Sequence, residues 1–125
     1  MKQYKTYQEL DAWLKARELV KNIYLVTKNF PKEEIFGLAA QIRRCAVSVP
    51  SNIAEGYGRQ YKKETIHFFY IARGSLYELE TQIIIATDLL FIPQEVLNDV
   101  IRQIEHCRKL LSGLIKYFEN NTQLK

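Results

Sequence analysis

Apolar residues recur at three- and four-residue spacing along most of this sequence, and this spacing limits the possible folds more than any other feature. The pattern is clearest in residues 94–119, where one helical face is apolar and the other is charged. The apolar positions there are Leu97, Val100, Ile101, Ile104, Cys107, Leu111, Leu114, Ile115 and Phe118. The pattern predicts an amphipathic helix packed against a core.

The same spacing predicts three further helices earlier in the chain. They cover about residues 7–29, 34–57 and 63–89. Thr6 is a candidate N-cap for the first of them, with Glu9 completing a capping box. Pro31 ends this helix, because the residue before a proline is pushed out of helical geometry.

Pro50 falls inside the second predicted helix. An internal proline costs about 3 kcal/mol and leaves the carbonyl four residues earlier without its hydrogen bond. The helix either breaks here, with Asn52 and Glu55 forming a new capping box, or continues with a kink. The apolar phase holds across Pro50, which favours one kinked helix.

Glycine and proline are scarce, with five and three copies in 125 residues, and the predicted connections are short. Short connections make consecutive helices antiparallel neighbours. We therefore expect an all-α protein, an antiparallel up-down-up-down four-helix bundle, as a single domain over residues 1–125.

The N-terminus has no apolar stretch of signal-peptide length, and the longest apolar run, residues 83–86, is far short of a membrane span. These features favour a cytoplasmic protein.

Cys45 and Cys107 both fall within helical patterns, so we expect reduced, buried thiols.

No complete catalytic or metal-binding constellation emerges. Glu64 and His67 form one Glu-x-x-His pair, but a di-iron bundle needs a second pair and two further inward glutamates. His106 is preceded three residues earlier by Gln103 instead of a glutamate, and it points about 100° away from the adjacent Cys107 on a helix. We expect no enzyme, no metal and no cofactor.

Residues 43–59, with the sequence RRCAVSVPSNIAEGYGR, place a polar strip beside the core stripe. One interpretation is local: the strip tolerates the kink and satisfies nearby backbone groups. The other is that it contacts another subunit or a nucleic acid.

Gly74, inside the third predicted helix, costs about 0.5–1 kcal/mol against alanine. Close approach of a helix from this or another subunit would justify this cost. The candidate structural or oligomer residues are Ser51, Asn52, Glu55, Gly56 and Gly74.

The net charge of +4 permits an acidic partner. Arg59, Lys62 and Lys63 form a basic cluster interleaved with tyrosines, which suits phosphate contacts and base stacking, although an ordinary solvated loop has the same composition. The candidate nucleic-acid-binding residues are Arg43, Arg44, Arg59, Lys62, Lys63 and Arg73.

Apolar residues outside the main stripes indicate a buried outer face and hence an oligomer. They are Tyr24, Val26, Phe68, Tyr70, Tyr77 and Ile84.

Two blocks, SNIAEGYGR at 51–59 and ARGSLYELE at 72–80, resemble the 23S rRNA intervening-sequence protein family, also called four-helix bundle proteins. The similarity extends from about Tyr7 to Phe118, with Val49 and Cys45 as mild departures. The resemblance implies a bacterial, cytosolic four-helix bundle that assembles as a ring-shaped homopentamer. It also implies kinship with accessory proteins of diversity-generating retroelements that bind nucleic acid and a reverse transcriptase.

Together these features favour a non-enzymatic oligomeric scaffold that binds structured nucleic acid, preferably RNA, through basic residues repeated around a ring. The alternative is a protein–protein interaction module or scaffold that binds no nucleic acid. Salt separates the two hypotheses, because phosphate contacts weaken as the salt concentration rises.

Overall fold

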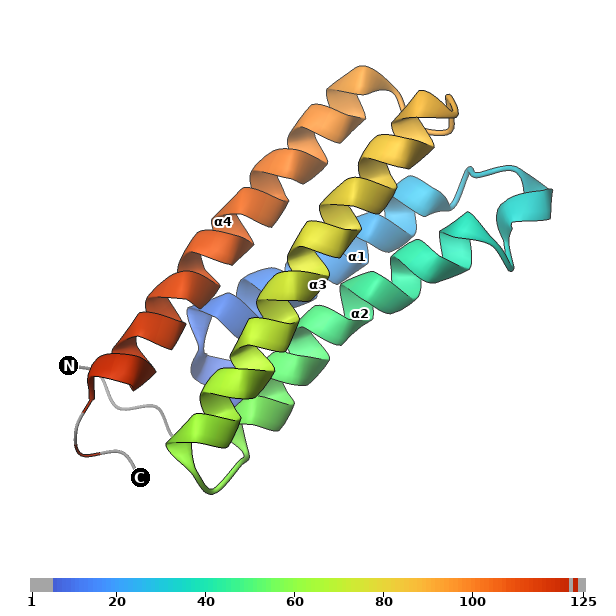
Figure 1. The fold of residues 1–125 in the computed structure, drawn as a ribbon. Coiled ribbons are helices and arrows are strands. Elements are labelled where there is room, and N and C mark those ends of the chain that lie inside the picture. The colour runs from blue at the N-terminus through green and yellow to red at the C-terminus, as the bar shows by residue number, and fades with distance from the viewer. Residues whose placement is uncertain (1–5, 122, 124–125) are drawn as a thin grey trace.

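The computed structural model describes residues 6–121 and 123, and within these the chain is helical with no strand. The prediction of an all-α protein with four helices is confirmed (Figure 1). The elements are the 3-10 helix η1 (Tyr7–Glu9), α1 (Asp11–Thr27), the 3-10 helix η2 (Lys32–Glu34), α2 (Leu38–Tyr57), α3 (Lys62–Asp88) and α4 (Gln94–Asn120).

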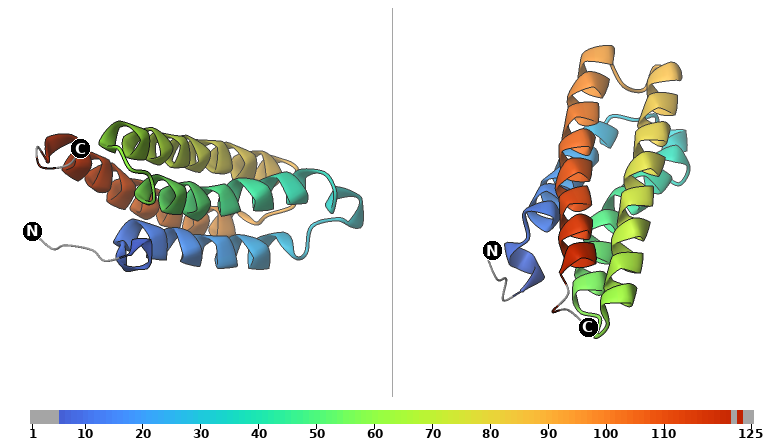
Figure 2. Two further views of the ribbon diagram at one scale, coloured as in Figure 1. Left: turned by 90° about the horizontal axis from the view of Figure 1, so that it is seen from below. Right: turned by 60° about the vertical axis from the view of Figure 1, so that its left-hand side comes forward.

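The helices pack in a closed cycle, α1 on α2, α2 on α3, α3 on α4 and α4 on α1. In the described part of the chain α1 and α3 do not pack on each other, so they occupy opposite corners of the bundle (Figure 2). Tyr70 of α3 meets Glu119 of α4, while Glu80 further along α3 meets Arg108 earlier in α4. These two helices therefore run in opposite directions.

The core lies along the bundle axis, where the apolar stripes of the four helices meet. Ile23, Val49, Phe69 and Ile104, one from each helix, are fully buried. Burial of one such side chain contributes roughly 1.5–3 kcal/mol. The hydrophobic period of the sequence therefore predicts the core directly.

Helix α1 begins later than the sequence pattern predicts, at Asp11 instead of Tyr7. Thr6 does cap a helix, since its Oγ1 accepts the backbone N–H of Gln8 at 2.9 Å, but the capped element is η1. Leu10, with φ −72° and ψ 127°, is extended and separates η1 from α1. A local capping signal cannot distinguish a single 3-10 turn from a long helix.

Helix α2 also begins later, at Leu38 instead of Glu34. Gly37 has the non-helical values φ −106° and ψ −117°. The Glu34 side chain bridges this break, because its Oε1 accepts the backbone N–H of Leu38 at 3.1 Å. Glu34 thus satisfies one of the free donors at the start of α2.

Helix α2 continues through Pro50 to Tyr57 as the apolar phase predicts, and the alternative of a break after the proline does not occur. The Ser48 hydroxyl donates to the carbonyl of Cys45 at 2.6 Å, and the Asn52 amide donates to the carbonyl of Ser48 at 2.8 Å. These bonds supplement the backbone ladder around the proline. The bend of the helix axis stays a prediction.

Gly56 lies in the last turn of α2, where it is buried against α3. A Cβ at this position would lie 2.8 Å from Phe68 Cβ and 3.0 Å from the carbonyl oxygen of Thr65. Only glycine therefore allows α2 and α3 to approach this closely just before the chain turns from one to the other.

Candidate functional site

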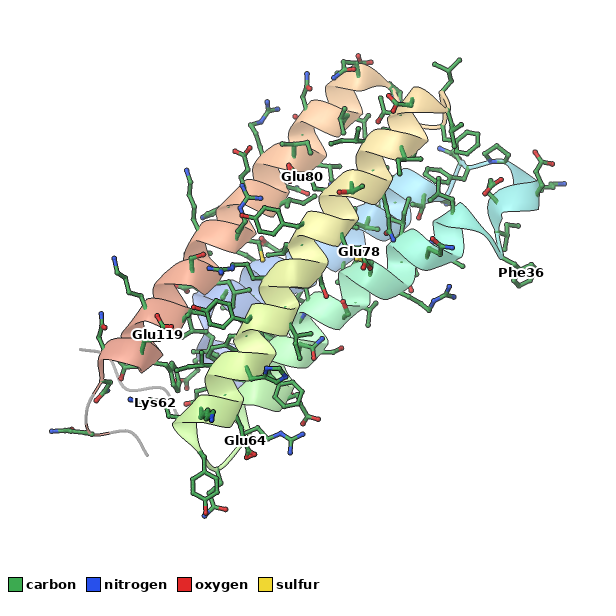
Figure 3. All side chains as sticks on the ribbon, in the orientation of Figure 1. Phe36, Lys62, Glu64, Glu78, Glu80 and Glu119 are labelled. Atoms are coloured by element: carbon green, nitrogen blue, oxygen red, sulfur yellow. The ribbon has the colours of Figure 1, made fainter. Side chains whose placement is uncertain are left out.

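The basic cluster predicted at the end of the bundle is present where α2 connects to α3. We call Arg59, Lys62 and Lys63 the basic end cluster; Lys62 and Lys63 open α3 (Figure 3). Arg59 lies 3.4 Å from a carboxylate oxygen of Glu55, and its guanidinium sits 4.7 Å from the centre of the Phe68 ring. Lys62 and Lys63 join none of the ion pairs found within residues 6–121. The cluster therefore retains uncompensated positive charge.

The other three candidate cations lie elsewhere. Arg43 is held against α1, since its Nε donates to Thr27 Oγ1 at 2.8 Å and its guanidinium lies 4.6 Å from the centre of the Tyr24 ring. Arg44 is exposed on α2, and Arg73 is half-buried in the middle of α3. Arg44 and the end of α2 are about 20 Å apart at 1.5 Å per residue. The six cations thus do not form one patch.

The polar strip of α2 makes local contacts. Ser48 and Asn52 bond to carbonyls of their own helix, and Glu55 pairs with Arg59 one turn further on. Ser51 is exposed. These contacts support the local interpretation of the strip, while the exposed serine leaves its outer edge open to a partner.

The two thiols are unsuited to nucleophilic chemistry. Cys45 and Cys107 are free and buried. Burial raises the pKa of Cys107 to about 12, and burial together with the neighbouring Glu78 carboxylate raises the pKa of Cys45 to about 12. The thiolate is the reactive form, so both groups are inert near neutral pH.

Among the residues that the structure describes, no group of three or more His, Cys, Asp and Glu residues could hold a metal ion. Within the same residues no helix combines the length and the apolar character that crossing a membrane requires.

The most unusual surface lies on α3, on the side turned away from the core. We call it the α3 outer face, and its residues are Tyr70, Ile71, Gly74, Tyr77, Glu78, Thr81, Ile84 and Ile85. Tyr77 is 53% exposed, and the other four large apolar side chains are 40–44% exposed. Glu78 is the one exposed charged residue of α3 between Phe68 and Thr87. A helix that is apolar on all sides is normally buried on all sides.

The α3 outer face has the spacing of a second helix-packing seam. Tyr70, Gly74, Tyr77, Thr81 and Ile84 follow one another at intervals of four and three residues, and large residues alternate with small ones. This is the spacing with which helices interlock in coiled coils. Nothing among the described residues lies within 4 Å of a Cβ built on Gly74, so close approach of a helix from the same chain does not explain this glycine.

Contacts with α4 and with arginines fix the tyrosines of this face. The Tyr70 hydroxyl donates to Glu119 at 3.0 Å, and this hydrogen bond raises the pKa of Tyr70. The guanidinium of Arg73 lies 4.6 Å from the Tyr70 ring centre, and that of Arg108 lies 4.8 Å from the Tyr77 ring centre. Ordered aromatic side chains lose little entropy on binding, which favours a docking role.

Sequence reasoning identified part of the α3 outer face and missed the rest. Tyr70, Tyr77 and Ile84 stood out as apolar residues outside the main stripe, but Ile71 and Ile85 did not. The signal was available, because Ile71 and Ile85 flank Glu78 at seven-residue intervals, in register with the tyrosine row.

The fold defines a four-helix bundle protein, and comparison with known proteins gives the family. Residues 8–113 match the family model described as 23S rRNA-intervening sequence protein, so the chain belongs to this family. A crystal structure of a protein with unknown function from the S23 ribosomal protein family of Bacteroides thetaiotaomicron VPI-5482 is similar, with a TM-score of 0.77 and 24% identity over 84% of this chain and 98% of that chain. At this identity the likeness concerns the fold alone. No curated protein matched.

Proposed function

We propose that the protein is a non-enzymatic homo-oligomeric scaffold, a ring of five copies, that binds structured RNA through the basic end cluster. The observation that carries the proposal is the α3 outer face, which stays exposed among the residues that the structure describes. Leaving such a surface in water forgoes about 25 cal/mol for each Å² of apolar area that could be buried. Association of copies removes this penalty.

Ring symmetry links the assembly to RNA binding. In a ring with cyclic symmetry, the same end of every copy lies on the same side, so the basic end cluster would repeat around one rim. A few cations on one copy bind a polyanion weakly, but several copies that contact one RNA gain avidity. The exposed Tyr61, between Arg59 and Lys62, adds a ring on which a base can stack.

We place this function in the bacterial cytoplasm. Free, buried thiols suit a reducing compartment. The family name links the family to 23S rRNA, which supports RNA over DNA as the nucleic acid.

Light scattering with structured RNA, at low and high salt, tests the proposal. We expect the oligomer to gain mass at low salt and to lose it at high salt, because phosphate contacts release counterions. Reversal of Arg59, Lys62 and Lys63 to Glu should abolish the gain. The matched control reverses Arg102, Lys109 and Lys116, which are exposed on α4, and changes the net charge equally. Equal loss in both variants, or in neither, contradicts a specific role for the cluster.

A second candidate function is docking of a different protein. The observation that favours it is a group of exposed apolar side chains at the other end of the bundle, where Figure 3 shows Phe36. Phe36 is 95% exposed, and Leu90 is 90% exposed. The two loops that carry them meet through Phe30 and Phe91, whose ring centres are 5.4 Å apart. A partner held there would survive high salt, unlike an RNA contact.

A further inference from the structure

The α3 outer face carries one charge near its middle. Glu78 lies seven residues from both Ile71 and Ile85, and Figure 3 shows it midway along α3. It joins none of the ion pairs found within residues 6–121. A carboxylate that is buried without a cation is strongly destabilising. Whatever covers this face must therefore bring a positive charge to Glu78.

A two-fold contact between two α3 outer faces does not meet this requirement. In a two-fold interface, the residue at the centre of the patch meets its own counterpart. Glu78 would then face a second carboxylate while both lose water, which disfavours the ionised pair. The occupant is a surface of different composition.

Such a surface lies on α1, at the opposite corner of the bundle (Figure 2). We call it the α1 outer face, and its residues are Leu14, Arg17, Glu18, Lys21, Leu25 and Lys28. The Glu18 carboxylate is paired with Lys15 of the same helix at 3.2 Å. Leu14 is 40% exposed and Leu25 is 60% exposed. Lys21 lies between these leucines along the helix and belongs to no ion pair within residues 6–121. The face thus combines apolar area with a central positive charge.

A groove beside this face can receive an aromatic side chain. It lies between α1 and α4 and has a volume of about 690 Å³. Leu14 and Leu110 supply an apolar lining, and the other lining residues are polar: Asp11, Lys15, Arg17, Glu18, Lys21 and His106. Tyr77, the most exposed large apolar side chain of the α3 outer face, has matching chemistry: an apolar ring with a polar tip.

We propose that a second copy of this chain docks its α1 outer face on the α3 outer face, with Lys21 of the second copy beside Glu78 and Tyr77 in the groove between α1 and α4. The inference rests on the proposed assembly and specifies its interface. After a single contact, one copy keeps an unused α1 outer face and the other keeps an unused α3 outer face. Contacts of this head-to-tail kind close into a ring when the rotation permits.

A charge exchange tests the pairing. Glu78→Lys and Lys21→Glu each place like charges at the contact and should weaken association at least tenfold, while the double variant should restore the wild-type mass. Lys109→Glu on α4 is the control and should leave the mass unchanged. Failure of the double variant to recover, or wild-type mass in both single variants, overturns the pairing. A wild-type protein that is monomeric at every concentration overturns the proposed assembly itself.

Cross-linking provides a second readout that does not depend on restored affinity. Thr81 lies on the α3 outer face and Arg17 lies about one turn before Lys21 on the α1 outer face, and both are exposed. With a short bis-maleimide, Thr81→Cys/Arg17→Cys, which keeps Lys21, should give a ladder of covalent oligomers, while either single variant should stay uncross-linked. Covalent dimers from Thr81→Cys alone would reveal a two-fold contact and overturn the proposal, as would a double variant without a ladder.

Discussion

Helices α3 and α4 have the same length, 27 residues each, and both bury one continuous stripe in the core. They differ on the outside. Every exposed position of α4 is a polar residue or glycine, whereas the middle of α3 exposes tyrosine and isoleucine side chains. The fold requires only the inner stripe, so the outer face of α3 reflects a requirement beyond folding. That requirement, in our account, is contact with another copy.

A charge placed on each outer face gives the largest expected difference between the two helices. Ile84→Glu should weaken association about 100-fold or more, because a carboxylate without a partner would become buried at the contact, a cost of about 3 kcal/mol. Asn98→Glu adds the same charge to the exposed face of α4 and should change nothing. Sedimentation equilibrium measures both, and equal behaviour of the two variants would remove the contrast.

The inner contact of α3 can be probed separately at Gly56. Gly56→Ala forces a Cβ against Phe68 and the Thr65 carbonyl and should lower the free energy of unfolding by about 1–3 kcal/mol. Urea unfolding, followed by circular dichroism, measures this loss. Gly58→Ala is the control and should unfold close to wild type, because a Cβ built there lies 3.6 Å from its nearest neighbour, the Ala54 carbonyl oxygen. An unaltered Gly56→Ala would mean that α2 and α3 are less closely packed than described.

The interior thiols on the two sides of the bundle should behave alike. Cys45 and Cys107 have pKa values raised to about 12 in the folded protein from 9.0, so the folded state keeps protons that the unfolded state loses first. Their stabilising contribution is complete below pH 9 and is lost as the pH rises from 9 to 12. At pH 10 each thiol should lower the free energy of unfolding by up to about 1.4 kcal/mol.

Unfolding at pH 8 and pH 10 checks this expectation. Cys107→Ala removes one titrating group, so its decrease between the two pH values should be smaller than that of the wild type. An identical decrease in both proteins would contradict the assigned burial of the Cys107 thiol.

The smallest expected effects on stability and association come from two exposed glycines inside helices, which form a closely matched pair. Gly74 on α3 and Gly113 on α4 both have no neighbour within 4 Å of a built Cβ. Alanine at either position should raise the unfolding free energy of the monomer by about 0.5–1 kcal/mol. Only Gly74→Ala should also weaken association, by a few-fold, because its added methyl group would lie in the contact between copies. Equal association of the two variants would argue against close helix contact at Gly74.

Much of the fold was predictable from sequence because one physical signal repeats. The helical period of apolar residues predicts the four helices and their buried stripes, and the continuous apolar phase correctly predicted that α2 passes through Pro50. The starts of α1 and α2 were wrong by about one turn. Thr6 and Glu34 make hydrogen bonds that a sequence cannot assign to one turn or to a long helix.

The candidate site was only partly predictable. Arg59, Lys62 and Lys63 are close in sequence, so their proximity follows directly, whereas the side of the bundle on which Arg43 and Arg73 lie depends on helix packing. Arg43, for example, donates a hydrogen bond to Thr27 of α1. This contact joins two helices, and no local sequence pattern predicts it. The α3 outer face became clear only once burial separated inner from outer apolar residues.

The most direct test of the central claim, that the α3 outer face is an assembly surface, is the molar mass of the wild-type protein by light scattering across a hundredfold range of concentration. Our account predicts a particle several times the chain mass of 14.7 kDa, five times for a pentamer, whose mass falls in the Ile84→Glu variant. A mass of 14.7 kDa at every concentration would contradict it.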